Sequence, residues 1–419
     1  MRFLNAYSPA PVCTPTRGAI FTGKCPARTQ LTTVFNGPAG PDDRLYDKSK
    51  YRGEHDQFFE ARHRHALPGS EVIIPEALAD GDYVTAFFGK WHIGECPGYY
   101  PEDRGFDVAK GYGLRQNVKR SHWMKDFAPS AANMDGADRD VYVADALTTQ
   151  CVEFITANRD NPWMAVLSHY LVHSPVQPKP DKLTKYQGKT TTDQNNPGYA
   201  AMVESVDESV GRLMQTIEKL GLEQNTLVIF TSDNGGLLLR QDNFIRASWN
   251  HPLREGKGTL YEGGLRIPAI VRWPGTIEAG RISEELIIST DIFPTLAELA
   301  GVPVDYEIEG RSLVPHLLRS EALDRETLYW HYPHYHLGMP GGVIREGYYK
   351  LIEYFETGEL ELYNLREDLH ESSNLAADLP EKAKELQKKL KSWREENRAS
   401  MPTPNPEYEM KQKKSANNE

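Results

Sequence analysis

Three short stretches of the chain are almost continuously apolar and rich in β-branched and aromatic side chains. They lie at residues 83–88, 163–168 and 226–231. Strands buried on both faces have this pattern, whereas a strand with one wet face alternates apolar and polar positions. The pattern therefore predicts three strands of one mostly parallel sheet.

Longer stretches between these runs repeat apolar residues every three or four positions. Residues 199–220 carry such a stripe, and Gly221 follows as a helix terminator. A second stripe covers residues 138–157, and a third begins at Asp291 and ends before Gly301. Strands that alternate with helices predict an α/β layered fold.

Polar residues follow each of the three apolar runs, at 89–92, 169–173 and 232–234. Ligands in α/β folds gather at the carboxyl ends of strands. We therefore expect these three polar segments to form one site.

The pattern changes after about residue 320. Short strands separated by glycine-containing turns predict an antiparallel meander, and residues 380–398 predict an amphipathic helix. We expect a large α/β domain over residues 1–320 and a small antiparallel subdomain over 321–399. Residues 400–419 lack apolar content, so we expect a disordered tail.

Composition excludes some classes of protein. The net charge of −11 argues against general nucleic-acid binding, and no apolar run approaches the length of a membrane span. The four cysteines, at 13, 25, 96 and 151, show neither metal-ligand spacing nor a disulfide framework. No signal peptide is recognisable, so the chain itself leaves its location undetermined, and its oligomeric state is equally undetermined.

Cys13 opens the sequence Cys-Thr-Pro-Thr-Arg-Gly-Ala-Ile-Phe-Thr-Gly. Pro15 suits the first turn of a helix, which places Cys13 at a helix N-terminus that favours an anion. Arg17, one turn on, adds a cation. The alternative is a free core cysteine followed by ordinary helix punctuation.

This run resembles the signature of the type I sulfatases, the formylglycine-dependent members of the alkaline phosphatase superfamily. The resemblance implies that a formylglycine-generating maturation enzyme oxidises Cys13, whose hydrated aldehyde is then the nucleophile. It also implies an alkaline-phosphatase-like α/β fold, with a large mostly parallel sheet between helices and a small C-terminal antiparallel subdomain with one helix.

Two further segments resemble sulfate-binding blocks of that family. In Gly-Lys-Trp-His at residues 89–92, the resemblance implies that Lys90 binds sulfate and that His92 assists the nucleophile. In the glycine-rich block at 252–264, it implies that Lys257 contacts sulfate. The alternatives are a solvated lysine beside a structural histidine, and an ordinary glycine loop.

Two histidines follow the run at 163–168. The family's matching histidine precedes a small residue and proline, so the resemblance assigns His173, before Ser174 and Pro175, to sulfate binding and to proton donation to the leaving alcohol. His169 is expected to be structural.

Asp233 and Asn234 follow the run at 226–231 and resemble the family's metal-binding pair. Their oxygens suit Ca²⁺, with Mg²⁺ as the second candidate, although Asp-Asn-Gly is also a common turn. The implied metal ligands are Asp233, Asn234 and the modified Cys13.

The chain departs from the family pattern before Cys13. Sulfatases begin with an apolar strand that ends in two metal-binding aspartates, and the twelve residues here contain no acid. Asp42 and Asp43 lie in a loop after the motif and do not take over that role. We hypothesise that Met1 is internal to a longer protein, and we expect weak metal binding and little activity from the chain as given.

The sequence thus favours a sulfuric ester hydrolase that acts on a sulfated carbohydrate or aryl sulfate, with no nucleic acid as partner and no membrane span. A phosphate or phosphonate ester hydrolase of the same superfamily, or an inactive paralogue that binds sulfated glycans, remains an alternative. Family resemblance suggests a periplasmic or extracellular location. The segment at residues 331–336, with three histidines, belongs either to the substrate cleft or to subdomain packing.

Overall fold

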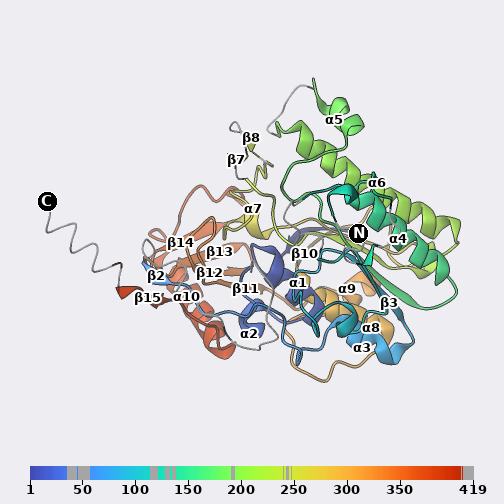
Figure 1. The fold of residues 1–419 in the computed structure, drawn as a ribbon. Helices are drawn as coiled ribbons and strands as arrows, with labels where there is room; N and C mark the ends of the chain where they lie inside the picture. The colour runs from blue at the N-terminus through green and yellow to red at the C-terminus, as the bar shows by residue number, and fades with distance from the viewer. Residues whose placement is uncertain are drawn as a thin grey trace.

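The computed structural model describes residues 1–34, 45, 57–113, 121–127, 133–134, 138–189, 194–238, 240–241, 245–246, 248–406 and 408. Its larger part holds two main sheets (Figure 1), beside a two-stranded ribbon of β7 (Arg240–Gln241) and β8 (Ile245–Arg246). One has the order β10-β1-β9-β6 and the other β4-β3-β5. The strands are β1 (Arg2–Tyr7), β3 (Val84–Gly89), β4 (Val108–Lys110), β5 (Trp163–Ser168), β6 (Val228–Thr231), β9 (Ala269–Arg272) and β10 (Ile282–Ile288).

The three strands predicted from apolar runs correspond to β3, β5 and β6. β3 pairs in parallel with both β4 and β5, and β1 pairs in parallel with β10. β9 is the exception, because it runs antiparallel to β1 and to β6. β1 covers half of the twelve residues before Cys13.

Helices cover both faces of these sheets (Figure 1). Side chains of β3 alternate between the two faces. Phe88 packs with Leu147 of α4 (Val143–Ala157), and Phe87 packs with Phe293 of α8 (Ile292–Ala300). The other helices are α1 (Cys13–Thr22), α2 (Pro26–Thr29), α3 (Ile74–Leu78), α5 (Pro180–Tyr186), α6 (Pro197–Lys219), α7 (Glu262–Leu265), α9 (Val314–Arg319) and α10 (Pro380–Glu396).

Helix α4 begins five residues later than the prediction of 138. Tyr142 forms a bridge with Trp123, and the Met124 amide donates to the Val141 carbonyl at 3.0 Å. Pairing with a distant loop therefore holds the first residues of the stripe in an extended form.

The C-terminal part is the predicted antiparallel meander of β11 (Thr327–Tyr332), β12 (Gly341–Glu346), β13 (Tyr349–Tyr354) and β14 (Leu360–Asn364). Ile344 and Leu351 pack against α10, whereas Val343 and Ile352 pack with Tyr7 of β1. The sheet therefore lies between its own helix and the larger part. The division at residue 320 stays a prediction.

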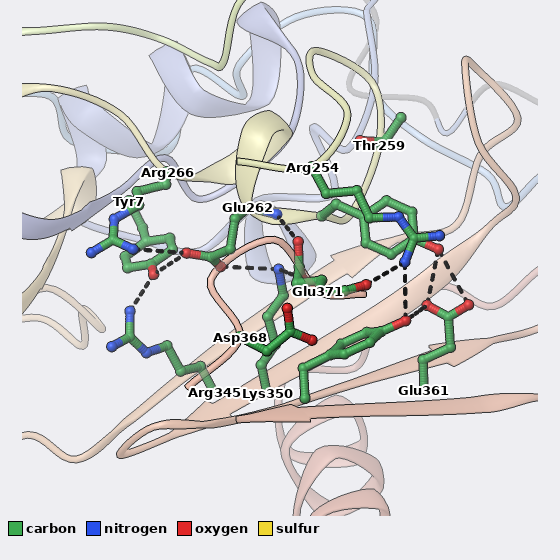
Figure 2. Close-up of polar contacts among 12 residues, drawn as sticks. Tyr7, Arg254, Thr259, Glu262, Arg266, Arg345, Lys350, Glu361, Asp368 and Glu371 are labelled. Atoms are coloured by element: carbon green, nitrogen blue, oxygen red, sulfur yellow. Dashed lines mark hydrogen bonds and ion pairs between the residues drawn. The ribbon is translucent and has the colours of Figure 1, made fainter. Parts of the chain in front are cut away.

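A buried charged network joins the two parts (Figure 2). The Lys350 ammonium of β13 lies 3.0 Å from a Glu262 oxygen and 2.7 Å from a Glu371 oxygen. Tyr7 donates to Glu262 at 2.6 Å, and Arg345 contacts Tyr7. Glu262 lies within the glycine-rich block at 252–264, so the network anchors that block to the C-terminal sheet.

The expected disordered tail differs from the structure at its start. Thr403–Pro404 forms β15 and pairs with β2 (Phe58–Phe59), and Asn405 donates to the Gln57 carbonyl at 2.9 Å. Backbone pairing and a buried Asn405 order this stretch without apolar side chains. Apart from Tyr408, residues 407–419 lie outside the described residues, as do Asp42 and Asp43. Within the described chain, no helix combines the length and apolarity needed to cross a membrane.

Candidate active site

Cys13 is the first residue of α1 and is only 2% exposed. The Lys257 ammonium lies 3.1 Å from its sulfur. The two residues are 244 positions apart in the chain, so the fold rather than local sequence makes this contact.

Arg17 lies one turn along α1 and connects three loops. Its guanidinium donates to one Asp233 oxygen at 3.0 and 2.8 Å, to the Lys90 carbonyl at 2.6 Å and to the Ser168 hydroxyl at 2.5 Å. The Lys90 ammonium lies 3.7 Å from the same Asp233 oxygen. The carboxyl ends of β3, β5 and β6 therefore meet at Arg17, as the sequence predicted for the three polar segments.

The cations change the pKa values of their neighbours. Burial alone would raise the pKa of the Cys13 thiol, but Lys257, Lys90 and Arg17 together lower it to about 6. Arg17, Lys90 and Lys257 likewise hold the pKa of Asp233 well below its usual range despite burial. Burial lowers the pKa of Lys90 to about 8. The site is thus built to hold negative charge at position 13.

Glycines let the Lys257 loop approach the rest of the site. A Cβ on Gly256 would lie 2.3 Å from the Gly236 carbonyl oxygen. Gly258 has a φ of +85°, and a Cβ there would lie 2.2 Å from a ring nitrogen of His336. Larger residues at these positions would push Lys257 away from Cys13.

The predicted histidines separate into different positions. His173 lines the same cavity as Arg17, Lys90, Asp233, Asn234 and Lys257. Its Nδ1 lies 2.7 Å from the Ser174 carbonyl oxygen, which can only accept, so Nδ1 carries the hydrogen and Nε2 is the nitrogen that exchanges a proton.

His169 also lines this cavity, and His92 occupies a different position. His169 bonds Ser209 at 2.9 Å, and burial lowers its pKa to about 4, which suits the structural role expected for it. His92 follows Lys90 in the loop after β3 with a φ of 64°, and it is not among the described residues that line the cavity. Its assistance to the nucleophile stays a prediction.

The donors for a divalent cation form an incomplete set. The Asn234 side-chain oxygen is buried without a hydrogen-bond partner in the described structure, which suits a cation ligand. Asp233 beside it is already paired with Arg17 and Lys90. The described residues contain no group of three His, Cys, Asp or Glu side chains arranged for a metal. Ca²⁺ takes about 6–8 oxygen ligands, so these residues fit the ion only in part.

Ser168 is a site residue that sequence reasoning missed. Its hydroxyl donates to the Lys90 carbonyl at 2.7 Å and accepts from Arg17. Its place at the end of a predicted strand was the available signal. Of the segment at 331–336, His331 and His334 are buried, and His334 bonds Thr32 at 2.7 Å, whereas His336 is exposed beside Gly258. The segment therefore supplies both packing residues and one exposed residue beside the glycine-rich block.

Two family models match the chain. One, described as Sulfatase, matches residues 1–302, and the other, described as N-sulphoglucosamine sulphohydrolase, C-terminal, matches residues 255–400. Together they cover both parts of the fold.

Individual relatives agree with these models. The chain is 31% identical over 347 residues to N-acetylgalactosamine-6-sulfatase of Mus musculus, across 79% of this chain and 62% of that protein. It therefore spans less than two thirds of that relative's length. It is also 31% identical over 403 residues to arylsulfatase A of Homo sapiens, across 91% of this chain and 73% of that protein.

A solved structure shows the same architecture. Ps i-CgsB, crystallised in complex with k-i-k-neocarrahexaose, superposes with a TM-score of 0.75 at 25% identity, across 94% of this chain and 85% of that one. The predicted α/β, alkaline-phosphatase-like fold class is thereby confirmed. With a sulfatase model over residues 1–302 and sulfatases among its relatives, the chain belongs to the type I sulfatase family.

Proposed function

We propose that this chain is the catalytic part of a sulfuric ester hydrolase that removes sulfate from a sulfated carbohydrate or aryl sulfate. The observation that carries the proposal is the convergence of Arg17, Lys90 and Lys257 on Cys13 and Asp233. A sulfate ester spreads negative charge over its non-bridging oxygens, and this charge grows as the ester bond breaks. Fixed cations aimed at that charge are usually the largest catalytic contribution, on the order of 3 kcal/mol for one donor.

Each side chain then has a role that follows from its position. Lys257 and Lys90 hold the sulfate oxygens above position 13, and Arg17 fixes Asp233 and the Lys90 loop in place. His173 lines the cavity, and its Nε2 gives the departing alkoxide a proton. For His92 we keep the role that the family resemblance implies, which is assistance to the group at position 13.

Position 13 needs a nucleophile that can also release sulfate. We infer that Cys13 is converted to formylglycine by a maturation enzyme, since the hydrated aldehyde supplies one hydroxyl for attack and a second for release. The buried N-terminus of α1 and the three cations fit an anionic oxygen there. A divalent ion, Ca²⁺ or Mg²⁺, would be held by Asp233, Asn234 and the modified residue 13, and it would polarise the sulfate.

The names of the relatives favour a sulfated carbohydrate as substrate. His336, exposed beside Gly258, is placed to contact the sugar that carries the sulfate. A periplasmic, lysosomal or extracellular location would suit such a substrate.

Mass spectrometry of the Cys13 peptide, after co-production with a formylglycine-generating enzyme, tests the proposal first. We expect the thiol to be replaced by an aldehyde. Residual hydrolysis of p-nitrophenyl sulfate should then exceed that of p-nitrophenyl phosphate, and it should disappear in Cys13→Ala and Lys257→Met but persist in Lys384→Met, which changes an exposed lysine of α10. Hydrolysis that prefers phosphate, or that survives Cys13→Ala, would overturn the proposal.

A further inference from the structure

One residue of the C-terminal part holds both ends of the loop that carries Lys257. The loop runs from Arg254 to Glu262, the first residue of α7. The Arg254 guanidinium donates to the Glu371 backbone carbonyl at 2.6 Å, and the Glu262 amide donates to the Glu371 carboxylate at 2.7 Å. Figure 2 shows Glu371 between these two partners. Glu371 therefore fixes the separation of the two ends of the loop.

The Glu371 carboxylate is itself held from a second side. Its other oxygen lies 2.7 Å from the Lys350 ammonium of β13. Glu371, Glu262 and Lys350 are all fully buried. Water cannot replace a lost contact at such a place, and a buried donor without an acceptor is costly. The contact between Glu371 and the Glu262 amide is therefore a rigid one.

The turn that carries Glu371 has a strained backbone. The φ of Glu371 is +54°, a left-handed conformation that is unfavourable for a residue with a Cβ. Such a conformation persists only where surrounding contacts impose it. The Asp368 carbonyl accepts from the Glu371 amide at 3.2 Å, and the Asp368 carboxylate accepts from the amides of Ser372 and Ser373 at 2.7 and 2.9 Å. Asp368 thus shapes the turn that presents Glu371 to the loop.

The loop forms a closed unit above Glu371. The Gly263 amide donates to the Arg254 carbonyl at 2.9 Å, so the two ends of the loop also contact each other. On the side of the charged site, the Lys257 amide donates to the Gly236 carbonyl at 3.0 Å. The backbone of Lys257 is therefore held between the site and the base that Glu371 fixes.

A small shift of this base would matter at position 13. The Lys257 ammonium lies 3.1 Å from the Cys13 sulfur. The attraction between a cation and an anion falls with their separation, and a misplacement of about 1 Å is enough to impair a catalytic group. Glu371 is not among the described residues that line the cavity, so it can influence the site only through the loop.

We propose that Glu371 is a positioning residue for Lys257: by binding Arg254 and Glu262 it fixes the base of the loop and holds the Lys257 ammonium at residue 13. The consequence for catalysis rests on the sulfate-binding role proposed above for Lys257. The positioning itself does not, and it can be measured without hydrolysis.

Three variants of the full chain test the proposal. Glu371→Leu removes the carboxylate and leaves Lys350 paired with Glu262, and Arg254→Met removes the other contact at a half-buried side chain. Two variants are used so that poor folding of one does not decide the outcome. Glu353→Leu is the matched control, because Glu353 also lies on β13 but pairs with Arg394 of α10 at 2.6 Å.

Hydrogen exchange with mass spectrometry measures the hold on the loop. We expect Glu371→Leu and Arg254→Met each to speed exchange of the amides at 254–264 about tenfold, because loss of an anchoring hydrogen bond allows local opening. Glu353→Leu should leave these amides unchanged and speed exchange in α10 instead.

Alkylation of the unmodified Cys13 thiol by iodoacetamide at pH 7 measures whether the Lys257 ammonium stays at the sulfur. We expect Glu371→Leu to slow alkylation about fivefold, since the cation that favours the thiolate moves away. In the Lys257→Met background, Glu371→Leu should have no further effect, because two changes that act through the same ammonium are not additive. Glu353→Leu should leave the rate unchanged in either background.

Three results would overturn the proposal. One is unchanged exchange at 254–264 in both Glu371→Leu and Arg254→Met. Another is alkylation that does not slow in Glu371→Leu, and the third is equal slowing with and without Lys257. A chain that meets these expectations but prefers phosphate esters would refute the proposed function alone, whereas a sulfatase in which Glu371→Leu acts independently of Lys257 would refute this inference alone.

Discussion

The ionisation of Cys13 gives a test of the site that needs neither conversion to formylglycine nor substrate. Lys257, Lys90 and Arg17 lower the pKa of this thiol from 9.0 to about 6 against the effect of burial. Three pKa units correspond to about 4 kcal/mol in favour of the thiolate. At pH 7 about nine tenths of the molecules would then carry a thiolate, compared with about one in a hundred for an ordinary thiol.

The other three cysteines provide an internal reference. Burial raises the pKa of Cys25, raises that of Cys151 to about 12, and raises that of Cys96. The thiolate is the nucleophilic form, so iodoacetamide should modify Cys13 alone near neutral pH. The assay follows alkylation of each cysteine peptide by mass spectrometry from pH 5 to pH 10, on chain whose Cys13 is an unmodified thiol and with EDTA present.

Removal of one cation shows how far a single charge shifts the pKa of Cys13. The Lys257 ammonium is 3.1 Å from the sulfur, and a neighbouring opposite charge shifts a pKa by about 1–3 units. Lys257→Met should raise the midpoint of the Cys13 profile by about 2 units, to near pH 8, and reduce the alkylation rate at pH 7 about tenfold. Lys384→Met, at a side chain 69% exposed on α10, should leave the profile unchanged. A wild-type midpoint above pH 8, or the same midpoint in Lys257→Met, would refute this account of the site.

Three further predictions concern the buried network and the metal. Lys350→Met should lower the free energy of unfolding by about 3–5 kcal/mol, since it leaves two buried carboxylates without their shared cation. Urea unfolding measures this free energy. A decrease no greater than that of Lys384→Met would contradict the prediction. Burial and Glu262 raise the pKa of Glu371 to about 7 despite Lys350. A raised carboxyl pKa means that the stabilising contribution of Glu371 is complete below about pH 4.5 and is lost as pH rises through about 7. The midpoint temperature of unfolding of Glu371→Gln should therefore change less between pH 5 and pH 8 than that of wild type. A parallel change in both proteins would count against the raised pKa. Ca²⁺ should bind with a dissociation constant weaker than micromolar, because Asp233 is already paired with Arg17 and few oxygen donors surround it. Isothermal titration calorimetry measures this constant. Micromolar or tighter binding would show that the donor set is more complete than the described residues indicate.

Periodicity alone was enough to predict the strands that carry the site. β5 occupies residues 163–168 as predicted, because nearly every side chain in that run is apolar and no glycine or proline interrupts it. Helix α6 ends at Lys219 before Gly221, where the terminator was expected. The start of α4 could not be read from its stripe, since the competing partner of Tyr142 lies in a loop nineteen positions away.

Some contacts of the site could be predicted from the sequence, and others could not. Arg17 and Cys13 are one helical turn apart, so their proximity follows from α1 alone. The Lys257 contact joins residues 244 positions apart, and the sequence indicated it only through a family pattern. Ser168 was missed because a serine at a strand end has no distinctive motif, and only the folded Arg17 guanidinium gives it a role.

The apolar stripe of α6 shows what a correct prediction of local structure leaves open. The sequence gives the stripe and its period, and both are right, but a stripe predicts only that some partner covers it. In the structure Leu213 and Leu220 of the stripe pack against the core around α4, whereas Val203, Val206 and Val210 line a cavity. β5 and β6 both end at Arg17, which contacts Ser168 and Asp233. Periodicity therefore predicts the strands and the helix one by one, whereas the contacts that fix the charged site exist only in the folded chain.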